Sequence, residues 1–217
     1  MNANPIRATL VLLAAAVGTA TPIGAETVTD RYDDTFRKYA QRFFGPGFDW
    51  RIFKAQAMAE SNVDMNAKSW VGARGIMQLM PSTFAEIRSK NPEIASIDKP
   101  EWNIAAGIYY DRQLWNRWTE QAGEADRQRF MFASYNAGRG TLLRAQNVAR
   151  SQTLDPSLWL SIQTVAPDVP KWRHQETLGY VQKIERHAVR IDDVGRVVAL
   201  TDEGQGTARS LMSNPPR

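Results

Sequence analysis

The 217-residue sequence contains no cysteine. Disulfide bonds, thiolate metal sites, a thiol nucleophile and a lipid anchor on an N-terminal cysteine are therefore excluded. Histidine is scarce as well, because only His174 and His187 occur. They lie far apart in the sequence with no third ligand beside either, so we expect no metal site and no cofactor.

The chain also lacks an excess of charge of one sign. Lysine and arginine total 27 against 23 aspartate and glutamate, and the two signs are interspersed along the sequence. Nucleic-acid-binding domains usually gather their basic residues on one face. We therefore expect no nucleic-acid partner. Hydrophobic residues make up 43% of the chain, which is typical of a protein that buries a core.

The N-terminus is typical of a secretory signal peptide. Arg7 precedes an apolar stretch from Ala8 to Val17, and small residues follow up to Ala25. This stretch is too short to cross about 30 Å of hydrocarbon as a helix, and no second apolar segment follows it. We expect residues 1–25 to be cleaved on export to a periplasm, with no stable membrane insertion. An uncleaved anchor is the alternative.

Apolar residues recur at helical spacing through most of the remaining chain. This spacing predicts an all-α fold, with at most a minor hairpin from a weak strand at 194–200. Three prolines between 156 and 170 indicate a loop-rich crossing. Residues 26–190 form one predicted domain, and 191–217, poor in large apolar groups, a flexible tail. The predicted helices cover 29–44, 49–61, 82–89, 100–118, 126–136, 141–150 and 175–190.

One carboxylate falls in an unusual position. Phe53, Ala57 and Glu60 are spaced i, i+4 and i+7, which places Glu60 on the apolar face in the last turn of its helix. Burial and the negative end of the helix dipole both favour the neutral acid and raise the pKa of such a group. A carboxylic acid of this kind is able to donate a proton near neutral pH. Taken alone, however, a glutamate at a helix end is more often simply solvated.

Four sequence blocks favour the catalytic interpretation. In order along the chain they are Glu60-Ser61-Asn62, then Ser69 with Gly72-Ala73-Arg74-Gly75-Ile76-Met77-Gln78-Leu79-Met80-Pro81, then Ser134-Tyr135-Asn136-Ala137-Gly138, and then Glu176-Thr177 with Tyr180-Val181. In both order and gaps they resemble the family 1 lytic transglycosylase domain of the soluble lytic transglycosylase type. The start of the domain, with Asp49-Trp50-Arg51, is similar to the catalytic part of the membrane-bound transglycosylase F branch.

The resemblance implies a lysozyme-like helical fold that acts on peptidoglycan glycan strands. Enzymes of this family cleave the β-1,4 bond from MurNAc to GlcNAc and leave a 1,6-anhydroMurNAc end. By position, Glu60 matches the catalytic acid/base. The resemblance assigns substrate contacts to Ser61, Ser69, Gln78, Met80, Tyr135, Asn136, Glu176 and Tyr180.

The implied chemistry explains why a single carboxylate suffices. Most glycosidases use two, one as acid and one as nucleophile or base. In a lytic transglycosylase the MurNAc C6 hydroxyl is the nucleophile, so one glutamate serves first as acid and then as base. Water must be excluded, and we expect Met77, Met80 and Tyr135 to line the site.

Two residues depart from the family pattern. Ser134 stands where alanine is usual, which should not disturb the neighbouring tyrosine. Trp70 stands where proline or a small residue is common. Its indole either stacks on a sugar in the cleft or plugs the loop against the core.

Two other functions remain open on the same residues. One is a true hydrolase of the same fold, such as a muramidase, and the other is a noncatalytic wall-binding protein associated with a secretion apparatus. A secretion complex is also a candidate partner for the enzyme itself. We expect the chain to be a monomer.

Overall fold

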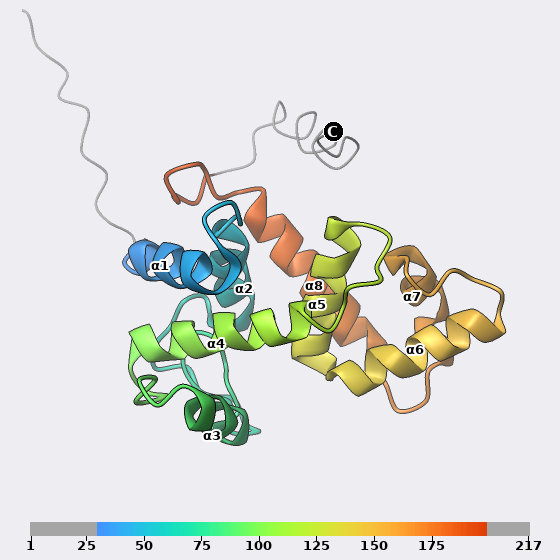
Figure 1. Cartoon of the computed structure of the whole chain (residues 1–217), viewed down its shortest axis with the longest axis horizontal. Helices are drawn as coiled ribbons and strands as arrows, with labels where there is room; N and C mark the ends of the chain where they lie inside the picture. Colours follow the sequence, from blue (N-terminus) through green and yellow to red (C-terminus); the bar gives the residue numbers. More distant parts are fainter. Residues whose placement is uncertain (1–29, 199–217) are drawn as a thin grey trace, which may run out of the picture.

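The computed structural model describes residues 30–198, and the elements in this range are helical, which confirms the predicted all-α class (Figure 1). Residues 1–29, with the predicted signal peptide, and residues 199–217 lie outside this description. Within the described range no helix is both long and apolar enough to cross a membrane. The elements are α1 (Asp33–Phe44), α2 (Arg51–Ser61), α3 (Pro81–Lys90), α4 (Pro100–Trp115), α5 (Glu124–Ala137), α6 (Arg139–Ser151), α7 (Trp159–Val165), the short 3-10 helix η1 (Ala166–Asp168) and α8 (His174–Ala188).

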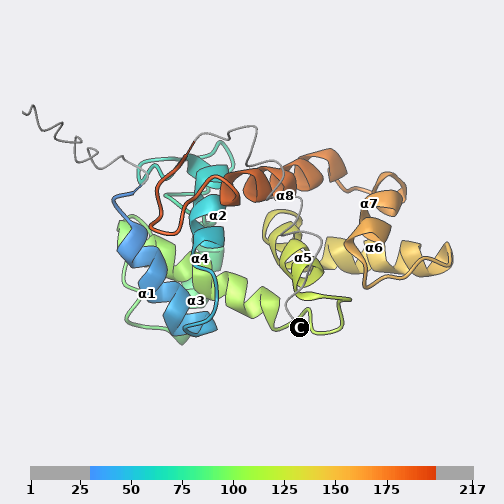
Figure 2. The same cartoon turned by 90° about the horizontal axis from the view of Figure 1, so that it is seen from above.

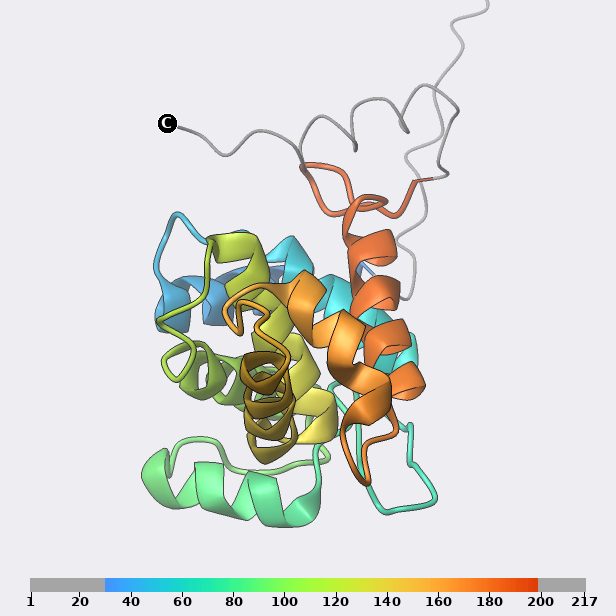
Figure 3. The ribbon, with the colours of Figure 1, turned by 90° about the vertical axis from the view of Figure 1, so that its right-hand side faces the viewer.

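The helices form two groups joined by α5 and α8. Helices α1 to α4 lie on one side, α6 and α7 on the other, and α5 and α8 run between them in both views (Figures 1 and 2). Helix α3 lies at the edge of the first group, at the bottom of Figure 3. Helix α2 packs against α8, and α5 contacts α4, α6 and α8. The core is therefore continuous, and α2, α5 and α8 meet inside it.

Local chemistry sets most helix boundaries. Pro81 and Pro100 occupy the first positions of α3 and α4, where a missing N–H costs nothing. Helix α2 ends at Ser61 and is capped by Asn62, whose φ of 56° is left-handed. The N–H of Asn62 bonds to the carbonyl of Met58, and the next N–H along the chain bonds to that of Ala57. Gly138, with φ of 79°, separates α5 from α6. These signals explain why the predicted and observed helices agree to within a few residues.

The sequence analysis missed one helix. It predicted a loop-rich crossing where α7 and η1 lie. Pro156 precedes α7 and Pro167 follows it, so the prolines flank the helix and do not interrupt it. Trp159, Ile162 and Val165 form a buried stripe at helical spacing. Seven residues are too few to show this period clearly in a sequence, and the helix exists because its stripe is buried.

The predicted flexible tail is wrong for residues 191–198. Ile191 is buried, and it forms an isolated β-bridge with Val197. The remaining positions of the weak predicted strand fall partly outside the described residues, and inside them only this bridge forms. Residues 191–198 fold back against α1 and α2 as a short hairpin, which the sequence could not reveal because polar contacts hold it.

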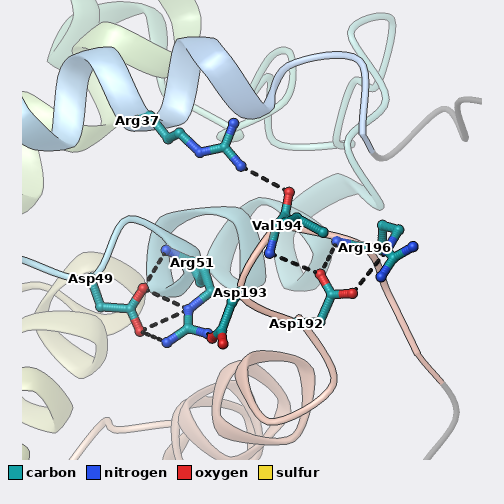
Figure 4. A network of polar contacts seen from close by, with 7 residues as sticks. All are labelled: Arg37, Asp49, Arg51, Asp192, Asp193, Val194 and Arg196. Carbon is teal, nitrogen blue, oxygen red and sulfur yellow. Dashed lines mark hydrogen bonds and ion pairs between the residues drawn. The ribbon is translucent and has the colours of Figure 1, made fainter.

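Two arginines and one lysine fix this hairpin, and Figure 4 shows the arginine contacts. Arg37 of α1 donates to the carbonyl of Val194 at 2.8 Å, and Arg51 of α2 pairs with Asp193 at 2.7 Å. Lys54 of α2, fully buried, donates to the carbonyl of Gly195 at 2.6 Å. The segment that follows α8 is thus attached directly to the helix that carries Glu60.

Lys54 also holds the beginning of the described chain. Its ammonium pairs with Asp30 at 2.9 Å and with Asp33 at 2.7 Å. A buried ammonium is tolerated only when its charge and donors are compensated, and here the two carboxylates compensate the charge while Asp30 and the Gly195 carbonyl accept hydrogen bonds. Residues from both ends of the domain therefore converge on α2.

Candidate active site

Glu60 lies in the last turn of α2, half-buried, with its carboxyl facing α8. Tyr180 of α8 donates its hydroxyl hydrogen to Glu60 Oε1 at 2.6 Å. One turn further along α8, Lys183 donates to the backbone carbonyl of Ala59 at 2.7 Å. The packing of α2 against α8 thus orients the carboxyl predicted to be catalytic.

The surroundings of Glu60 bring its pKa into the neutral range. Burial raises its pKa to about 7. The hydrogen bond from Tyr180 and the charge of Lys183 oppose this rise, because both favour the carboxylate. A pKa of this value leaves both forms populated at neutral pH, so the same group is able to act as acid and then as base.

Tyr135 of α5 lies near Glu60 but is bonded elsewhere. Its hydroxyl donates to the backbone carbonyl of Met77 at 2.7 Å. Burial, followed by the charge of Glu60, raises the pKa of the Tyr135 phenol well above its usual value, so the phenol stays neutral. The Met77 side chain is fully buried, so the expectation that it lines the site is wrong: its backbone, and not its thioether, contributes there.

The loop from residue 62 to residue 80 is ordered by its own polar side chains. Ser61 Oγ donates to the carbonyl of Ile76 at 2.8 Å and accepts the N–H of Asp64 at 3.1 Å. Ser69 Oγ accepts the N–H of Ala73 at 2.9 Å. These two serines, predicted to contact substrate, therefore hold the loop in place, and a contact with sugar remains a prediction.

Gln78 has a similar bracing role. Its side-chain amide donates to the carbonyl of Gly75 at 2.8 Å and to that of Ala67 at 3.2 Å. Its backbone has a left-handed φ of 44°, which is uncommon for a residue other than glycine. The two hydrogen bonds of the side-chain amide hold the backbone in this conformation.

Asn103 of α4 is a supporting residue that the sequence analysis missed. It is buried, its Oδ1 accepts the N–H of Met77 at 2.8 Å, and its Nδ2 donates to the carbonyls of Arg74 and Ile97. Gly75, with φ of 74°, lies so close that an added Cβ would be 2.5 Å from the Asn103 amide. Glycine is needed at this position because any side chain would collide with Asn103. The glycines marked this loop in the sequence, but nothing in the sequence indicated that an asparagine of α4 packs against it.

Trp70 is 92% exposed at the tip of the same loop. The alternative in which it plugs the loop against the core is therefore wrong. Met80 is 39% exposed and lines a recess of about 450 Å³ together with Ser69. An exposed indole beside a recess has the geometry for stacking on a sugar ring.

Asn136 and Glu176 are not held against Glu60. Asn136 is exposed near the end of α5. Glu176 lies in the first turn of α8, one turn before Tyr180, and its carboxylate pairs with Arg173 at 2.9 Å. The structure brings together Glu60, Tyr180 and Tyr135, whereas the roles predicted for Asn136 and Glu176 stay predictions.

A second acid lies beneath the site, and the sequence did not indicate it. Asp111 of α4 is fully buried, and its Oδ1 accepts a 3.3 Å hydrogen bond from Gln56 of α2. Burial raises the pKa of Asp111 well above its usual value, and the charge of Glu60 raises it further. Asp111 Oδ2 and Gln56 Oε1 have no hydrogen-bond partner. Asp111 is thus an acid whose neutral form is favoured by burial and that no solvent-borne substrate reaches.

The Ser134 side chain makes a hydrogen bond that the alanine usual at this position in the family could not make. Its hydroxyl, fully buried, accepts the indole N–H of Trp118 at 2.9 Å.

Over residues 30–198 no group of three or more histidine, aspartate or glutamate side chains is arranged to hold a metal ion.

Comparison with known proteins agrees with this geometry. The profile of the transglycosylase SLT domain family matches residues 34–156, more than half of the chain. The chain belongs to this family. The match covers Glu60, the loop and Tyr135, while Tyr180 lies beyond it on α8.

Two curated relatives are named membrane-bound lytic murein transglycosylase F. That of Shewanella pealeana is 32% identical over 83% of this chain, and that of Marinobacter nauticus is 34% identical over 72%. The alignments cover 38% and 32% of those proteins, so the chain spans well under half of their length. The predicted similarity to the transglycosylase F branch is confirmed.

A solved structure shows the same fold. The 70 kDa soluble lytic transglycosylase of Escherichia coli superposes with a TM-score of 0.55 and 26% identity over 75% of this chain and 25% of its own. The same enzyme in complex with bulgecin A matches with a TM-score of 0.55 and 25% identity over 73% of this chain and 24% of its own. The fold is lysozyme-like, as predicted.

Proposed function

We propose that the chain is a peptidoglycan lytic transglycosylase that cleaves the β-1,4 bond from MurNAc to GlcNAc and forms a 1,6-anhydroMurNAc end. The observation that carries this proposal is the half-buried Glu60, whose pKa is raised to about 7 and which Tyr180 holds by a 2.6 Å hydrogen bond. Membership of the SLT transglycosylase family and relatives named lytic murein transglycosylases support it.

The reaction proceeds through two proton transfers on one carboxyl group. Protonated Glu60 donates its proton to the glycosidic oxygen as the bond to MurNAc C1 breaks, and the GlcNAc portion leaves as an alcohol. The N-acetyl group stabilises the positive charge at C1. The MurNAc C6 hydroxyl then attacks C1 while the Glu60 carboxylate accepts its proton. Glu60 ends protonated, ready for the next cycle, and no water is consumed.

The neighbouring acid favours a lyase over a hydrolase. A glycosidase that hydrolyses its substrate needs a second carboxylate beside the sugar ring, as nucleophile or as base for water. Asp111, which lies close enough to Glu60 for the charge of Glu60 to raise its pKa, is fully buried. It is inaccessible to substrate, and burial favours its neutral form, so it is not placed to supply such a group.

The decisive experiment is mass spectrometry of sacculi digested with the protein. A lytic transglycosylase releases fragments one water lighter than those of a muramidase, because the end is anhydro rather than reducing. Glu60→Gln should abolish release, while Glu124→Gln, an exposed glutamate of α5, should leave it unchanged. Reducing ends would show that the chain is a hydrolase, and full activity of Glu60→Gln would show that another group is the acid.

We also propose that the enzyme works in the periplasm as a monomer. Residues 1–25 carry the sequence pattern of a signal peptide, and relatives are named membrane-bound murein transglycosylases. Peptidoglycan is the proposed partner, and a secretion apparatus that needs a local gap in the wall is a second candidate. Cell fractionation together with N-terminal sequencing of the exported protein tests the compartment and the cleavage after residue 25.

A further inference from the structure

Two buried polar side chains meet one helical turn before Glu60. Gln56 precedes Glu60 by four residues on α2, so the two side chains project from the same side of that helix. Asp111 comes from α4, and Gln56 Nε2 donates to Asp111 Oδ1 at 3.3 Å. Gln56 and Asp111 are both fully buried. Their contact therefore links α4 to the helix that carries the proposed acid.

Each partner of this contact keeps one buried oxygen without a hydrogen bond. The two oxygens are Asp111 Oδ2 and Gln56 Oε1. If Asp111 is ionised, both are acceptors, and the protein interior then holds two unsatisfied acceptors, one of them charged. Buried polar groups are almost always paired, and an unpaired buried charge is especially costly. If Asp111 instead carries a proton on Oδ2, the same two oxygens become one donor and one acceptor.

A carboxylic acid and a primary amide are complementary in shape. Each is planar and presents two polar atoms along one edge. The amide N–H donates to one oxygen of the acid, as Gln56 does to Asp111, and the O–H of the acid donates to the amide oxygen. The two hydrogen bonds close a ring. A single proton on Asp111 Oδ2 thus accounts for both of the unpartnered oxygens.

The charges around Asp111 also favour its protonated form. Among the described residues, the ion pairs of this protein do not include Asp111. Burial raises its pKa well above the usual value, the amide hydrogen bond opposes that rise, and the charge of Glu60 on α2 adds to it. The other titratable groups on which the charge of Asp111 acts are phenols, namely Tyr110 beside it on α4, Tyr135 on α5 and Tyr180 on α8. Phenols supply no positive charge to balance a carboxylate.

A charge on Asp111 would disturb the two steps proposed for Glu60. Glu60 first gives up a proton and then accepts one, which works best when its pKa is close to the ambient pH. A second carboxylate nearby would repel the Glu60 carboxylate, raise the pKa of Glu60 and make it a weaker acid. A protonated Asp111 avoids this repulsion, and its contact with Gln56 still braces α2 one turn from Glu60.

We propose that Asp111 is protonated in the working enzyme and donates its Oδ2 hydrogen to Gln56 Oε1, so that an acid–amide pair braces α2 and leaves Glu60 as the one ionisable carboxyl at this place. Asp111 and Gln56 are positioning residues, because neither touches substrate. The consequence for the reaction rests on the proposed function, whereas the protonation of Asp111 does not depend on any substrate.

Carbon NMR of the protein labelled at the aspartate Cγ tests the proton directly. The Asp111 signal is the one that Asp111→Asn removes, and the urea-unfolded protein at pH 8 supplies the reference for an ionised aspartate. We expect the Asp111 signal at the position of a protonated acid, unchanged between pH 5 and pH 8. A signal at the carboxylate position anywhere in this range would overturn the inference.

The pH–rate profile of Asp111→Asn tests the electrostatic role. Asparagine is neutral and able to make both hydrogen bonds with Gln56, so it imitates the protonated acid. We expect the alkaline limb, which follows the pKa of Glu60, to stay at the pH of the parent enzyme. If Asp111 is ionised in the parent, the substitution removes a repelling charge and the limb moves to lower pH, which would overturn the inference.

The bracing role is tested by breaking the pair and by restoring it. Gln56→Met and Asp111→Leu each remove the hydrogen bonds, and we expect kcat to fall about tenfold or more with little change in KM, because Glu60 loses its alignment. Asp111→Asn should restore most of kcat. Gln146→Met is the matched control, since it removes a buried amide of α6 that bonds to the Pro156 carbonyl, and it should leave kcat unchanged. An unchanged kcat in Gln56→Met would refute the bracing role.

The outcomes separate this inference from the proposed function. The NMR signal is read without substrate, so a protonated Asp111 would support the pair even if digested sacculi give reducing ends. An ionised Asp111 would overturn the pair even if the digested sacculi give anhydro ends.

Discussion

The Tyr180 hydroxyl donates a 2.6 Å hydrogen bond to Glu60 Oε1 across 120 positions of sequence. The two residues belong to α8 and α2, and Lys183 of α8 bonds the backbone of α2 at Ala59 beside them. Helix α8 thus sets the direction of the carboxyl group, while Tyr180 and Lys183 limit the rise in its pKa that burial causes. The hairpin of residues 191–198, bonded to α1 and α2, holds the end of α8 in this position.

Tyr180→Phe should move the alkaline limb of the pH–rate profile to higher pH. The first step needs protonated Glu60, so the rate falls as pH rises through its pKa of about 7. The Tyr180 hydrogen bond stabilises the carboxylate and lowers that pKa, and its loss lets the pKa rise. The measurement is the initial rate of sacculus solubilisation between pH 5 and 9. Tyr109→Phe, a half-buried tyrosine of α4, is the control and should leave the limb in place. A limb that moves to lower pH, or stays fixed, contradicts this account of Glu60.

Asp111→Asn should stabilise the fold at pH 8. The pKa of Asp111 is raised in the folded state, so its contribution to stability is present below its unfolded pKa near 3.8 and is lost as pH rises through the folded value. Asparagine removes this loss. Its amide is also able to donate to Gln56 Oε1, which has no partner now.

We expect a gain of at least about 1 kcal/mol in the free energy of unfolding at pH 8, and a smaller gain at pH 4. Urea unfolding at the two pH values measures it. Asp34→Asn, at an exposed position of α1, should change stability by less than about 0.5 kcal/mol at either pH. A gain that grows on acidification would mean that Asp111 is ionised in the fold.

Gly195→Ala should loosen the hairpin and destabilise the protein. Gly195 has a φ of 103°, and an added Cβ would collide with Asp33 and Trp50. We expect a loss of about 2 kcal/mol or more in the free energy of unfolding, from backbone strain and from displacement of the Lys54 contacts. Gly140→Ala is the control, because a Cβ there meets nothing within 4 Å in helix α6, and it should stabilise slightly. Equal melting temperatures for the two variants would show that the hairpin contributes nothing.

Trp70→Ala should reduce glycan turnover while leaving the melting temperature almost unchanged. Its indole is 92% exposed and therefore contributes little to the folded state. Stacking of a sugar on an indole is worth about 1 kcal/mol or more, which corresponds to a fall of at least about fivefold in kcat/KM. Leu160→Ala, 72% exposed on α7, is the matched control for loss of exposed apolar area and should not affect turnover. A thermal loss without a loss of turnover would contradict the stacking role.

The sequence predicted the acid for a local reason. Phe53, Ala57 and Glu60 lie on one helix, so their spacing alone places the carboxyl on an apolar face. It did not reveal that Tyr135 bonds to the Met77 carbonyl, because a backbone acceptor leaves no mark in side-chain spacing. Nor did it show that Ser61, Ser69 and Gln78 brace the loop, since the same polar residues suit a brace and a sugar contact equally well.

By itself, the sequence determined the helical class, most helix boundaries, the family and the candidate for the acid, because these depend on period, on proline and glycine chemistry, and on short contiguous blocks. Only the tertiary structure decided what surrounds that acid. Three examples are the Tyr180 hydrogen bond, the buried Asp111 and the contacts of Lys54. Each of them joins residues from different parts of the chain. Burial and long-range pairing arise when helices pack, and spacing within one segment does not encode them.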